Sequence, residues 1–384
     1  MSPRSRFVIL AAGFGLFAAA CTGATGSSSD LVVVSDQGEV VVVGSSGGEA
    51  MLVDDGGSAF QPIWSPDGER VTFSAGSQGD TSLVTVSVLD GDRVALPLAT
   101  KPFFFMWDPS GTTVGWLRGT QDGIVFEADG EVQIEDDGRP FYLSWAPDGS
   151  RLAVHIGTDR LDELGSDGAT SIGVVPGSFQ APAWTADGVV AVSRSPAGEH
   201  LVVIDDGDVR RVASVDGVVR FVVAGDRAAV ETFAAADQPD QGNGVAAAFE
   251  TVASVPSGRL VVVDLSSGDV TEVLDRTAAA FLWSPDGRKL LILDVVDRQG
   301  TFRWLVWEDG DLVSTVDFVA DPGWFQTFVP FFDQYAQSMT LWSPDSEAFA
   351  FPGIIDDRPG VWVQSLSADE PLHVADGSWV AWRP

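Results

Sequence analysis

Trp64-Ser65-Pro66-Asp67-Gly68 is the stretch of sequence that decides the fold, because it returns intact as Trp283-Ser284-Pro285-Asp286-Gly287. Incomplete copies of this pentad begin at four further tryptophans: Trp107, Trp145, Trp184 and Trp342. Aligning Val230 with Val192 predicts another copy, without tryptophan, in which Val222 stands where Trp184 does. A last copy, Trp382-Arg383-Pro384, ends the sequence. The chain is therefore expected to hold eight structural repeats.

The spacing of the pentads predicts the architecture. Trp107 and Trp145 are 38 residues apart, and Trp145 and Trp184 are 39 apart. Valine-rich runs separated by Gly, Asp and Ser turns fill the intervals, and no amphipathic helix is expected. This is the length of one four-stranded propeller blade, so we expect an all-β propeller of about eight four-stranded blades. In each pentad, Pro and Asp-Gly suit a tight turn and Trp suits packing between blades.

The two ends of the sequence predict how the ring closes. Three strands, 31–34, 39–43 and 50–53, have no pentad before them, whereas the final strand, 378–382, has none of its partners after it. Joined, they make one complete blade and leave no exposed edge between the ends of the ring. Seven blades are the alternative if the copy at Val222 is not a true repeat.

The pentads resemble those of TolB-type propellers, which are relatives of WD-type repeats. The resemblance covers residues 31–384 and implies the fold, but a propeller serves many functions. The second domain that accompanies the propeller in TolB has no counterpart in this sequence, so a TolB-like role in an outer-membrane complex does not follow.

The first thirty residues are expected to be targeting sequence followed by a linker. Arg4 and Arg6 precede an apolar run, 7–20, that is shorter than a membrane-spanning helix and typical of a signal peptide. Ala18-Ala19-Ala20-Cys21 resembles the lipobox of bacterial lipoproteins. The prediction is a signal peptide at 1–20, lipidation at Cys21, a flexible Ser/Gly-rich tether at 21–30 and one propeller domain at 31–384. The protein is then extracytoplasmic and held at the membrane of the cell envelope by its lipid alone.

Charge and cysteine content exclude several classes of function. Lys and Arg number 22 against 55 Asp and Glu, a formal charge of 22 − 55 = −33. Such a surface repels nucleic acid and anionic lipid head groups, so no nucleic-acid partner is expected. Cys21 is the one cysteine, which excludes a disulfide framework.

No catalytic constellation is evident, and no cofactor or metal is expected. His155, His200 and His373 fall in three different blades. Gly44-Ser45-Ser46-Gly47-Gly48 matches a nucleophile elbow but is followed by a strand rather than the required helix. Acidic turns such as 135–137 could hold calcium, but the twelve-residue ligand loop of an EF-hand is missing.

Two insertions are the features most suggestive of function. The intervals from Val222 to Trp283 and from Trp283 to Trp342 are 61 and 59 residues, about twenty too long. The first insertion, 234–257, lies between the second and third strands of its blade, and the second, 320–338, lies between two blades. Because antiparallel strands alternate in direction, both emerge on one face, opposite the pentad turns.

The second insertion is aromatic, with Pro322 and Pro330 restricting it. Its side chains either pack as a plug over the channel or stay exposed as anchors for a partner. The candidate partner-binding residues are Trp324, Phe325, Phe328, Phe331, Phe332 and Tyr335. We expect a non-enzymatic scaffold that binds a protein or peptide of the envelope; the alternative is a propeller enzyme or carbohydrate-binding protein that uses acidic residues near the channel mouth.

Overall fold

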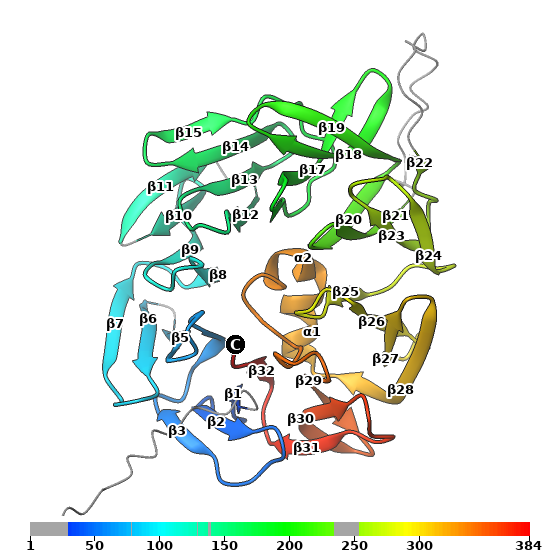
Figure 1. Cartoon of the computed structure of the whole chain (residues 1–384). Helices are drawn as coiled ribbons and strands as arrows, with labels where there is room; N and C mark the ends of the chain where they lie inside the picture. Colours follow the sequence, from blue (N-terminus) through cyan, green and yellow to red (C-terminus); the bar gives the residue numbers. More distant parts are fainter. Residues whose placement is uncertain (1–29, 78, 129, 137–139, 234–252) are drawn as a thin grey trace, which may run out of the picture.

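The strands form a ring around a central channel in the computed structural model, which describes residues 30–77, 79–128, 130–136, 140–233 and 253–384 (Figure 1). The predicted signal peptide, Cys21 and the tether up to residue 29 lie outside these residues. Within the described part of the chain, no helix is long and apolar enough to cross a membrane.

Seven sheets make eight blades, each running outward from the channel. Blade 1 contains β32 (Trp379–Trp382), β1 (Asp30–Val34), β2 (Val40–Gly44) and β3 (Met51–Asp54). Blade 2 contains β4 (Phe60–Trp64), β5 (Arg70–Ser77), β6 (Asp80–Ser87) and β7 (Arg93–Leu98). Blade 3 contains β8 (Pro102–Trp107), β9 (Val114–Gly119), β10 (Ile124–Ala128) and β11 (Glu131–Asp136). Blade 4 contains β12 (Phe141–Trp145), β13 (Leu152–Ile156), β14 (Arg160–Gly165) and β15 (Gly168–Ser171).

The second half of the ring departs from this regularity in two places. Blade 5 contains β16 (Ala183–Thr185), β17 (Gly188–Ser195), β18 (Gly198–Asp205), β19 (Asp208–Val215) and a short fifth strand, β22 (Ala253–Ser254). Blade 6 contains β20 (Val218–Ala224), β21 (Arg227–Phe233), β23 (Leu260–Asp264) and β24 (Val270–Leu274). Blade 7 contains β25 (Ala280–Trp283), β26 (Lys289–Val295), β27 (Thr301–Glu308) and β28 (Asp311–Ala320). Blade 8 contains β29 (Ala348–Ile355), β30 (Arg358–Ser365) and β31 (Leu372–Ala375), with a single bridge from Trp342 to Phe349 as its inner strand. A contact between β28 and β29 joins blades 7 and 8 into one seven-stranded sheet.

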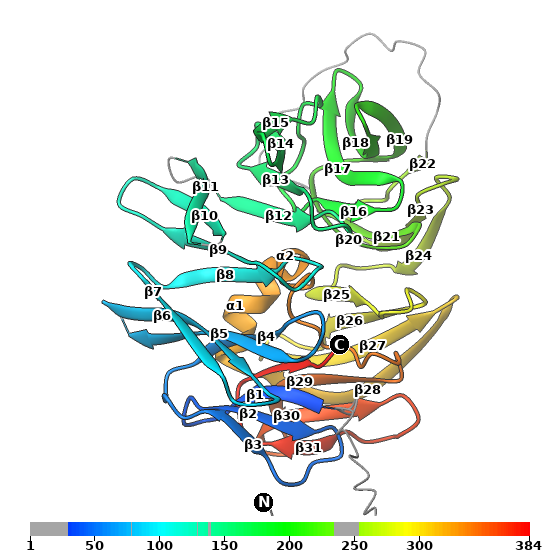
Figure 2. The same ribbon diagram turned by 60° about the vertical axis from the view of Figure 1, so that its left-hand side comes forward.

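The predicted closure is confirmed. β32 pairs antiparallel with β1, from Leu31 opposite Trp382 to Val34 opposite Trp379, so one blade takes strands from both ends of the propeller (Figure 2). The blade predicted without a tryptophan is also a complete four-stranded sheet. The described residues therefore form eight blades rather than seven.

The pentads form the turns between the first and second strand of the blades, as expected. Gly68 and Gly287, the fifth residues of the intact copies, have φ of 68° and 65°, the left-handed conformation that glycine adopts without strain. The Ser65 hydroxyl donates to Asp67, and the equivalent Ser284 donates to Asp286. Serine and aspartate thus fix the turn, and these residues have a structural role.

Trp64, Trp184, Trp283 and Trp342 link neighbouring blades through their indole N–H groups. The indole N–H groups of Trp107 and Trp145 have no hydrogen-bond partner among the described residues. Trp184 donates to the carbonyl of Ser144 and Trp342 to that of Leu282, in each case the residue before the tryptophan of the preceding blade. Trp283 donates in the same way to Val222. The residue that stands in place of tryptophan in blade 6 is therefore Val223, and the prediction of Val222 was wrong by one position. Val223 pairs with Ala228 as Trp184 pairs with Val189, so the residue of blade 6 that corresponds to Val192 is Glu231 rather than Val230, and aligning Val230 caused the slip.

The first insertion lies between β21 and β23, as predicted, although residues 234–252 are outside the described part. Its last residues form β22, which pairs in parallel with β19. The insertion of blade 6 thus adds a strand to the outer edge of blade 5.

The second insertion is helical, contrary to the expectation that the chain has no helix. It forms α1 (Pro322–Phe328), the 3₁₀ turn η1 (Val329–Phe331) and α2 (Phe332–Tyr335). These short helices lie inside the ring rather than on its surface (Figure 1). Residues 321–340 are called the plug below.

Candidate functional site: the plugged channel

The plug enters the ring from the outer end of blade 7. Asp321 caps α1 by accepting a hydrogen bond from the Trp324 backbone N–H at 2.9 Å, and Pro322 occupies the first turn, where no N–H is needed. Trp324 stacks on Phe328, with ring centroids 5.0 Å apart, and meets Trp304 of β27 edge to face. Both plug side chains are fully buried, so α1 is held by aromatic packing against blade 7.

The first half of α2 contacts three blades in succession. The Phe332 ring packs on Phe281 of blade 7 at 4.7 Å and lies 5.1 Å from the Arg220 guanidinium of blade 6. Asp333, the next residue, accepts a hydrogen bond from the Ala181 N–H of blade 5 at 3.1 Å. One residue step along the helix therefore moves the contact by one blade around the ring.

The second half of α2 continues around the ring. Gln334 exchanges two hydrogen bonds with the backbone of Leu143 in blade 4, at 2.6 and 2.9 Å. The Tyr335 hydroxyl donates to the Phe103 carbonyl of blade 3 and accepts from the Gln61 amide of blade 2. Four consecutive residues thus contact six of the eight blades, and the inner strand edges find partners in the plug instead of water.

The predicted partner-binding aromatics take up different positions in this arrangement. Trp324, Phe328 and Phe332 are 0% exposed and Tyr335 is 5% exposed, so these four belong to the core of the plug. Phe325 is half-buried against Phe302, with ring centroids 5.0 Å apart. Phe331 is 47% exposed and is the one member of the predicted set on the surface. The plug interpretation fits the buried residues, and contact with a partner stays a prediction for Phe325 and Phe331.

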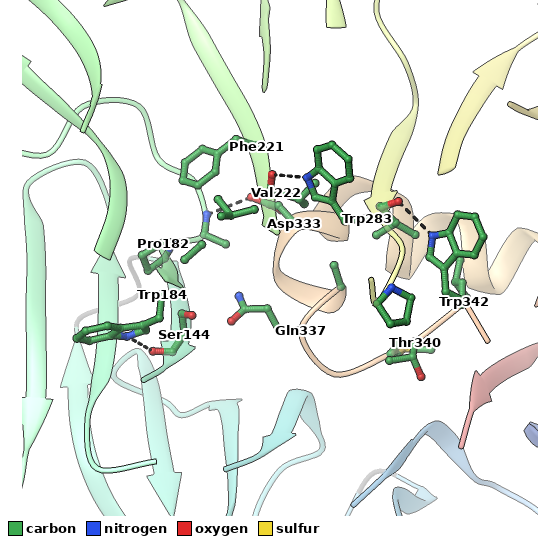
Figure 3. A pocket seen from close by; sticks show the side chains of 18 residues that line it. Ser144, Pro182, Trp184, Phe221, Val222, Trp283, Asp333, Gln337, Thr340 and Trp342 are labelled. Atoms are coloured by element: carbon green, nitrogen blue, oxygen red, sulfur yellow. Dashed lines mark hydrogen bonds between the residues drawn. The ribbon is translucent and has the colours of Figure 1, made fainter. Parts of the chain in front are cut away.

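A cup remains open at the pentad end of the channel. It consists of two cavities of about 370 and 250 Å³ that share Gln337 and Thr340 of the plug as lining. Tryptophan and proline side chains of the pentads line it: Trp64, Pro66, Trp107, Pro109, Trp145, Trp184, Trp283, Pro285 and Trp342. Figure 3 shows the larger cavity, with Gln337 extending between Trp184 and Trp342. The cup is an apolar depression whose floor is the C-terminal part of the plug.

Asp333 carries the only ionisable side chain, among the residues that the structure describes, that lines either cavity. Burial raises the pKa of its carboxyl group, against the opposing effect of the Ala181 N–H. Glu231 lies nearby in blade 6, where burial also raises its pKa although Arg220 and the Ala278 N–H bind its two oxygens. Both carboxyl groups are engaged by the protein itself, which suits them to holding the plug.

A set of cations that the sequence analysis missed binds successive pentads together. Arg70 lies over the ring of Trp107, 4.5 Å from its centroid, and donates to the Gly111 carbonyl at 2.7 Å. Arg227 makes the same two contacts with Trp283 and Gly287, and Lys289 donates to the Ser346 carbonyl. Arg151 lies over Trp184 and Arg383 over Trp64. In the sequence, a basic residue stands six positions after Trp64, Trp145 and Trp283, and this spacing could have revealed the set of cations.

The histidines remain separate, as their positions predicted. His155 is buried beside Phe179 and bonds the Gln180 carbonyl through Nδ1 at 2.9 Å, and burial lowers its pKa to about 4. No group of three or more His, Cys, Asp or Glu side chains that could hold a metal occurs among the described residues.

The fold and the site together define an eight-bladed β-propeller whose channel is filled by a segment of its own chain. No protein-family model and no curated protein matches the sequence. Among solved structures, the chain is similar to the dihydro-heme d1 dehydrogenase NirN in complex with DHE, at 13% identity over 92% of this chain and 74% of that one, with a TM-score of 0.59. A eukaryotic initiation factor matches at 13% identity over 93% and 98%, with a TM-score of 0.53.

TolB from Acinetobacter baumannii is also among the similar structures. It matches at 12% identity over 73% of this chain, with a TM-score of 0.38, and this chain spans 60% of its length. The two matches with TM-scores of 0.59 and 0.53 show a shared fold and, at 13% identity, carry nothing about activity.

Proposed function

We propose that this protein is a non-enzymatic scaffold that binds a protein or peptide partner through the cup, and that it is exported and held in the cell envelope by a lipid on Cys21. The observation that carries the binding role is the plug. Because α2 occupies the channel and contacts six of the eight blades, the space left at the pentad end is the cup, an apolar surface with the plug as its floor.

The size and chemistry of the cup fit part of a larger partner. Its two cavities, about 370 and 250 Å³, suit one or two side chains from a loop or chain end. Aromatic and proline side chains surround them, as in the desolvated pockets that receive the central residue of a protein interface. Thr340 and Gln337 supply polar atoms on the floor, which suits recognition of a peptide backbone.

The composition of the cup favours binding over the alternative of an enzyme or carbohydrate-binding site. Hydrolysis by paired carboxylates needs two such groups about 5 to 10 Å apart beside the substrate. Asp333 carries the one side-chain carboxylate among the described residues that line the cup, and it is engaged by Ala181.

The test separates the cup from the aromatic insertion. Partners are captured from membranes with the intact protein, identified, purified and measured against two variants. Gln337→Trp fills the cup, while Leu143 keeps its hydrogen bonds to Gln334. Phe331→Ser removes the exposed aromatic of the plug. We expect Gln337→Trp to weaken binding by about tenfold or more, equivalent to about 1.4 kcal/mol, and Phe331→Ser to leave it unchanged. Weaker binding by Phe331→Ser with normal binding by Gln337→Trp would place the partner on the insertion face. Failure to capture any partner that binds saturably would refute the binding role.

A further inference from the structure

A groove between blades 7 and 8 combines an unpaired strand edge, a buried acceptor without a partner and an excess of acidic side chains. β28 is the outer strand of blade 7, and it pairs with β29 only at Val319 opposite Ile354 and Ala320 opposite Gly353. Beyond these pairs β28 and β29 no longer pair, and a cavity of about 850 Å³ lies between the first half of β28 and the end of β30. This groove lies apart from the cup and shares no lining residue with it.

The wall of the groove formed by β28 is an unpaired strand edge. Glu308 opposite Asp311 closes a two-residue turn and is a hydrogen-bonded pair, so the pairs of Leu312 and Ser314 with β27 are the non-hydrogen-bonded ones. The backbone N–H and C=O of Leu312 and Ser314 therefore point away from β27. Ser314 lines the groove and is exposed, and Leu312, two residues earlier on the same edge, is exposed too. Such an edge is a template for another strand.

The opposite wall holds a buried acceptor without a partner. Gln364 is 3% exposed and lines the groove, and its Nε2 donates to the carbonyls of Ser365 and Ala368 at 2.8 and 2.7 Å. Its Oε1 accepts no hydrogen bond from any described residue. A buried oxygen left unpaired destabilises the folded protein, and an N–H group that reached it would offset this loss.

The chain already shows that its blades accept an added strand. Ala253 and Ser254 of β22 pair with Ala213 and Ser214 on the outer edge of blade 5. The edge of β28 offers the same backbone groups with an open cavity beside it.

Charge defines the kind of segment that fits. Five carboxylates and two cations line the groove, a balance of 2 − 5 = −3. Arg288 and Lys289 are paired with Glu308 and Glu347, each at 3.1 Å, so the excess is acidic. We propose that this groove binds a Lys- or Arg-bearing peptide segment in extended conformation, added as a strand to the free edge of β28, with one of its N–H groups donating to Gln364.

Two proline variants test the proposal on the whole propeller. Ser314→Pro removes an outward N–H and no hydrogen bond to β27, which an edge strand tolerates. Ser171→Pro is the matched control, because Ser171 also stands three residues after the closing residue of a two-residue turn, on the outer strand of blade 4. Peptides are selected on the wild-type protein from a random displayed library, synthesised and titrated against both variants.

We expect Ser314→Pro to weaken the selected basic peptides by about tenfold and Ser171→Pro to leave their affinity unchanged. Bound peptide should also slow amide exchange at Leu312 and Ser314 of the wild-type protein, a readout that holds even if Ser314→Pro unfolds. The cup variant Gln337→Trp should bind these peptides normally, which separates this site from the proposed function. Equal affinity for both proline variants, protection elsewhere, self-association through β28 or failure to select any peptide would overturn the proposal.

Discussion

Gln334 pairs with Leu143 as a neighbouring β-strand would. The Leu143 N–H donates to Oε1 at 2.6 Å, and Nε2 donates back to the Leu143 carbonyl at 2.9 Å, across 191 residues of sequence. A single side chain thus supplies both hydrogen bonds that the inner edge of blade 4 needs at this position, and it makes the plug part of the sheet system.

Replacing Gln334 by Leu should destabilise the fold by about 1–3 kcal/mol, because the buried Leu143 N–H loses its partner. Urea denaturation measures the change. Gln337→Leu is the matched control: Gln337 donates to the same carbonyl at 3.0 Å, but Gln334 still serves that oxygen after the change. The control should cost less, and equal losses would show that the pairing is not what holds the plug.

Deleting residues 378–384 should open the ring. It removes β32 with Trp379 and Trp382, which are 3% and 2% exposed, and leaves β1 as an unpaired edge. Removing even one buried tryptophan side chain costs about 3–5 kcal/mol, so a large fall in melting temperature and aggregation are expected. Removing Pro384 alone, which is exposed, should change neither. A truncated protein that melts like the full chain contradicts the closure.

Arg227→Met should cost about 1–2 kcal/mol of stability, since it removes a cation from the face of Trp283 and a donor from the Gly287 carbonyl while keeping the apolar stem. Arg288→Met is the control. The Arg288 side chain is 64% exposed and makes one surface ion pair with Glu308, worth less than about 1 kcal/mol. Thermal unfolding of both variants checks whether the cation between pentads, rather than positive charge in general, stabilises the ring.

The plug should respond to pH through Asp333. Burial raises its pKa in the folded state above the ordinary 3.8, so the folded protein binds more protons than the unfolded chain between these two values. The contribution of Asp333 to the free energy of unfolding is therefore full below about pH 4 and declines as the pH rises through the folded pKa. Asp333→Asn, which keeps an acceptor for Ala181, should unfold at higher urea than the wild type at pH 7.5, with the difference shrinking toward pH 3.5. A difference that grows on acidification would contradict the raised pKa.

The pentad aspartates should act in the opposite direction. Hydrogen bonds from the Ser343 hydroxyl and the Glu347 N–H lower the pKa of Asp345, so its contribution is present above its ordinary value and is lost as the pH falls. The free energy of unfolding of the Asp345→Asn variant should therefore fall less than that of the wild type as the pH is lowered. The same urea titrations separate this effect from that of Asp333.

Cys21→Ala should leave the precursor without lipid, because Cys21 follows the apolar run and is the only cysteine. Metabolic labelling with a fatty acid checks this, with Ser27→Ala in the tether as a control that should retain the label. Label on the Cys21→Ala protein would exclude this residue as the acylation site.

Most of the ring could be predicted because the same repeat recurs along the sequence, so each copy supports the same architecture. The pentads at Trp64 and Trp283 share one turn geometry, and a tight turn depends on neighbouring residues alone. The assignment of Val222 instead of Val223 shows the limit of this approach. Val222 and Val223 are adjacent valines, so residue type alone does not distinguish them, and the hydrogen bond from Trp283 to the Val222 carbonyl fixes the register.

The plug could be located from the sequence, but its conformation could not be predicted. Asp321 followed by Pro322 is typical of a helix start. However, α1 has seven residues and α2 has four, which is too short to show an amphipathic pattern. The aromatic content suited a buried plug and an exposed site equally well. Which one forms depends on contacts with residues such as Leu143 and Ala181, far away in sequence.

The plug also explains an asymmetry among the repeats. Eight blades approach rotational symmetry, but α2 is a single turn with no symmetry of its own, so equivalent positions around the channel cannot all meet the same side chain. The inner-strand residues that α2 contacts are accordingly all different: Gln61, Phe103, Leu143, Ala181, Arg220 and Phe281. At the other end of the same strands, where each pentad meets only the next one, the repeats stay alike. One end of each repeat thus contacts the next repeat in a common way, and the other end contacts α2 in its own way. Exchanging blade 2 with blade 7 would therefore misplace the side chains of Gln61 and Phe281 that contact α2.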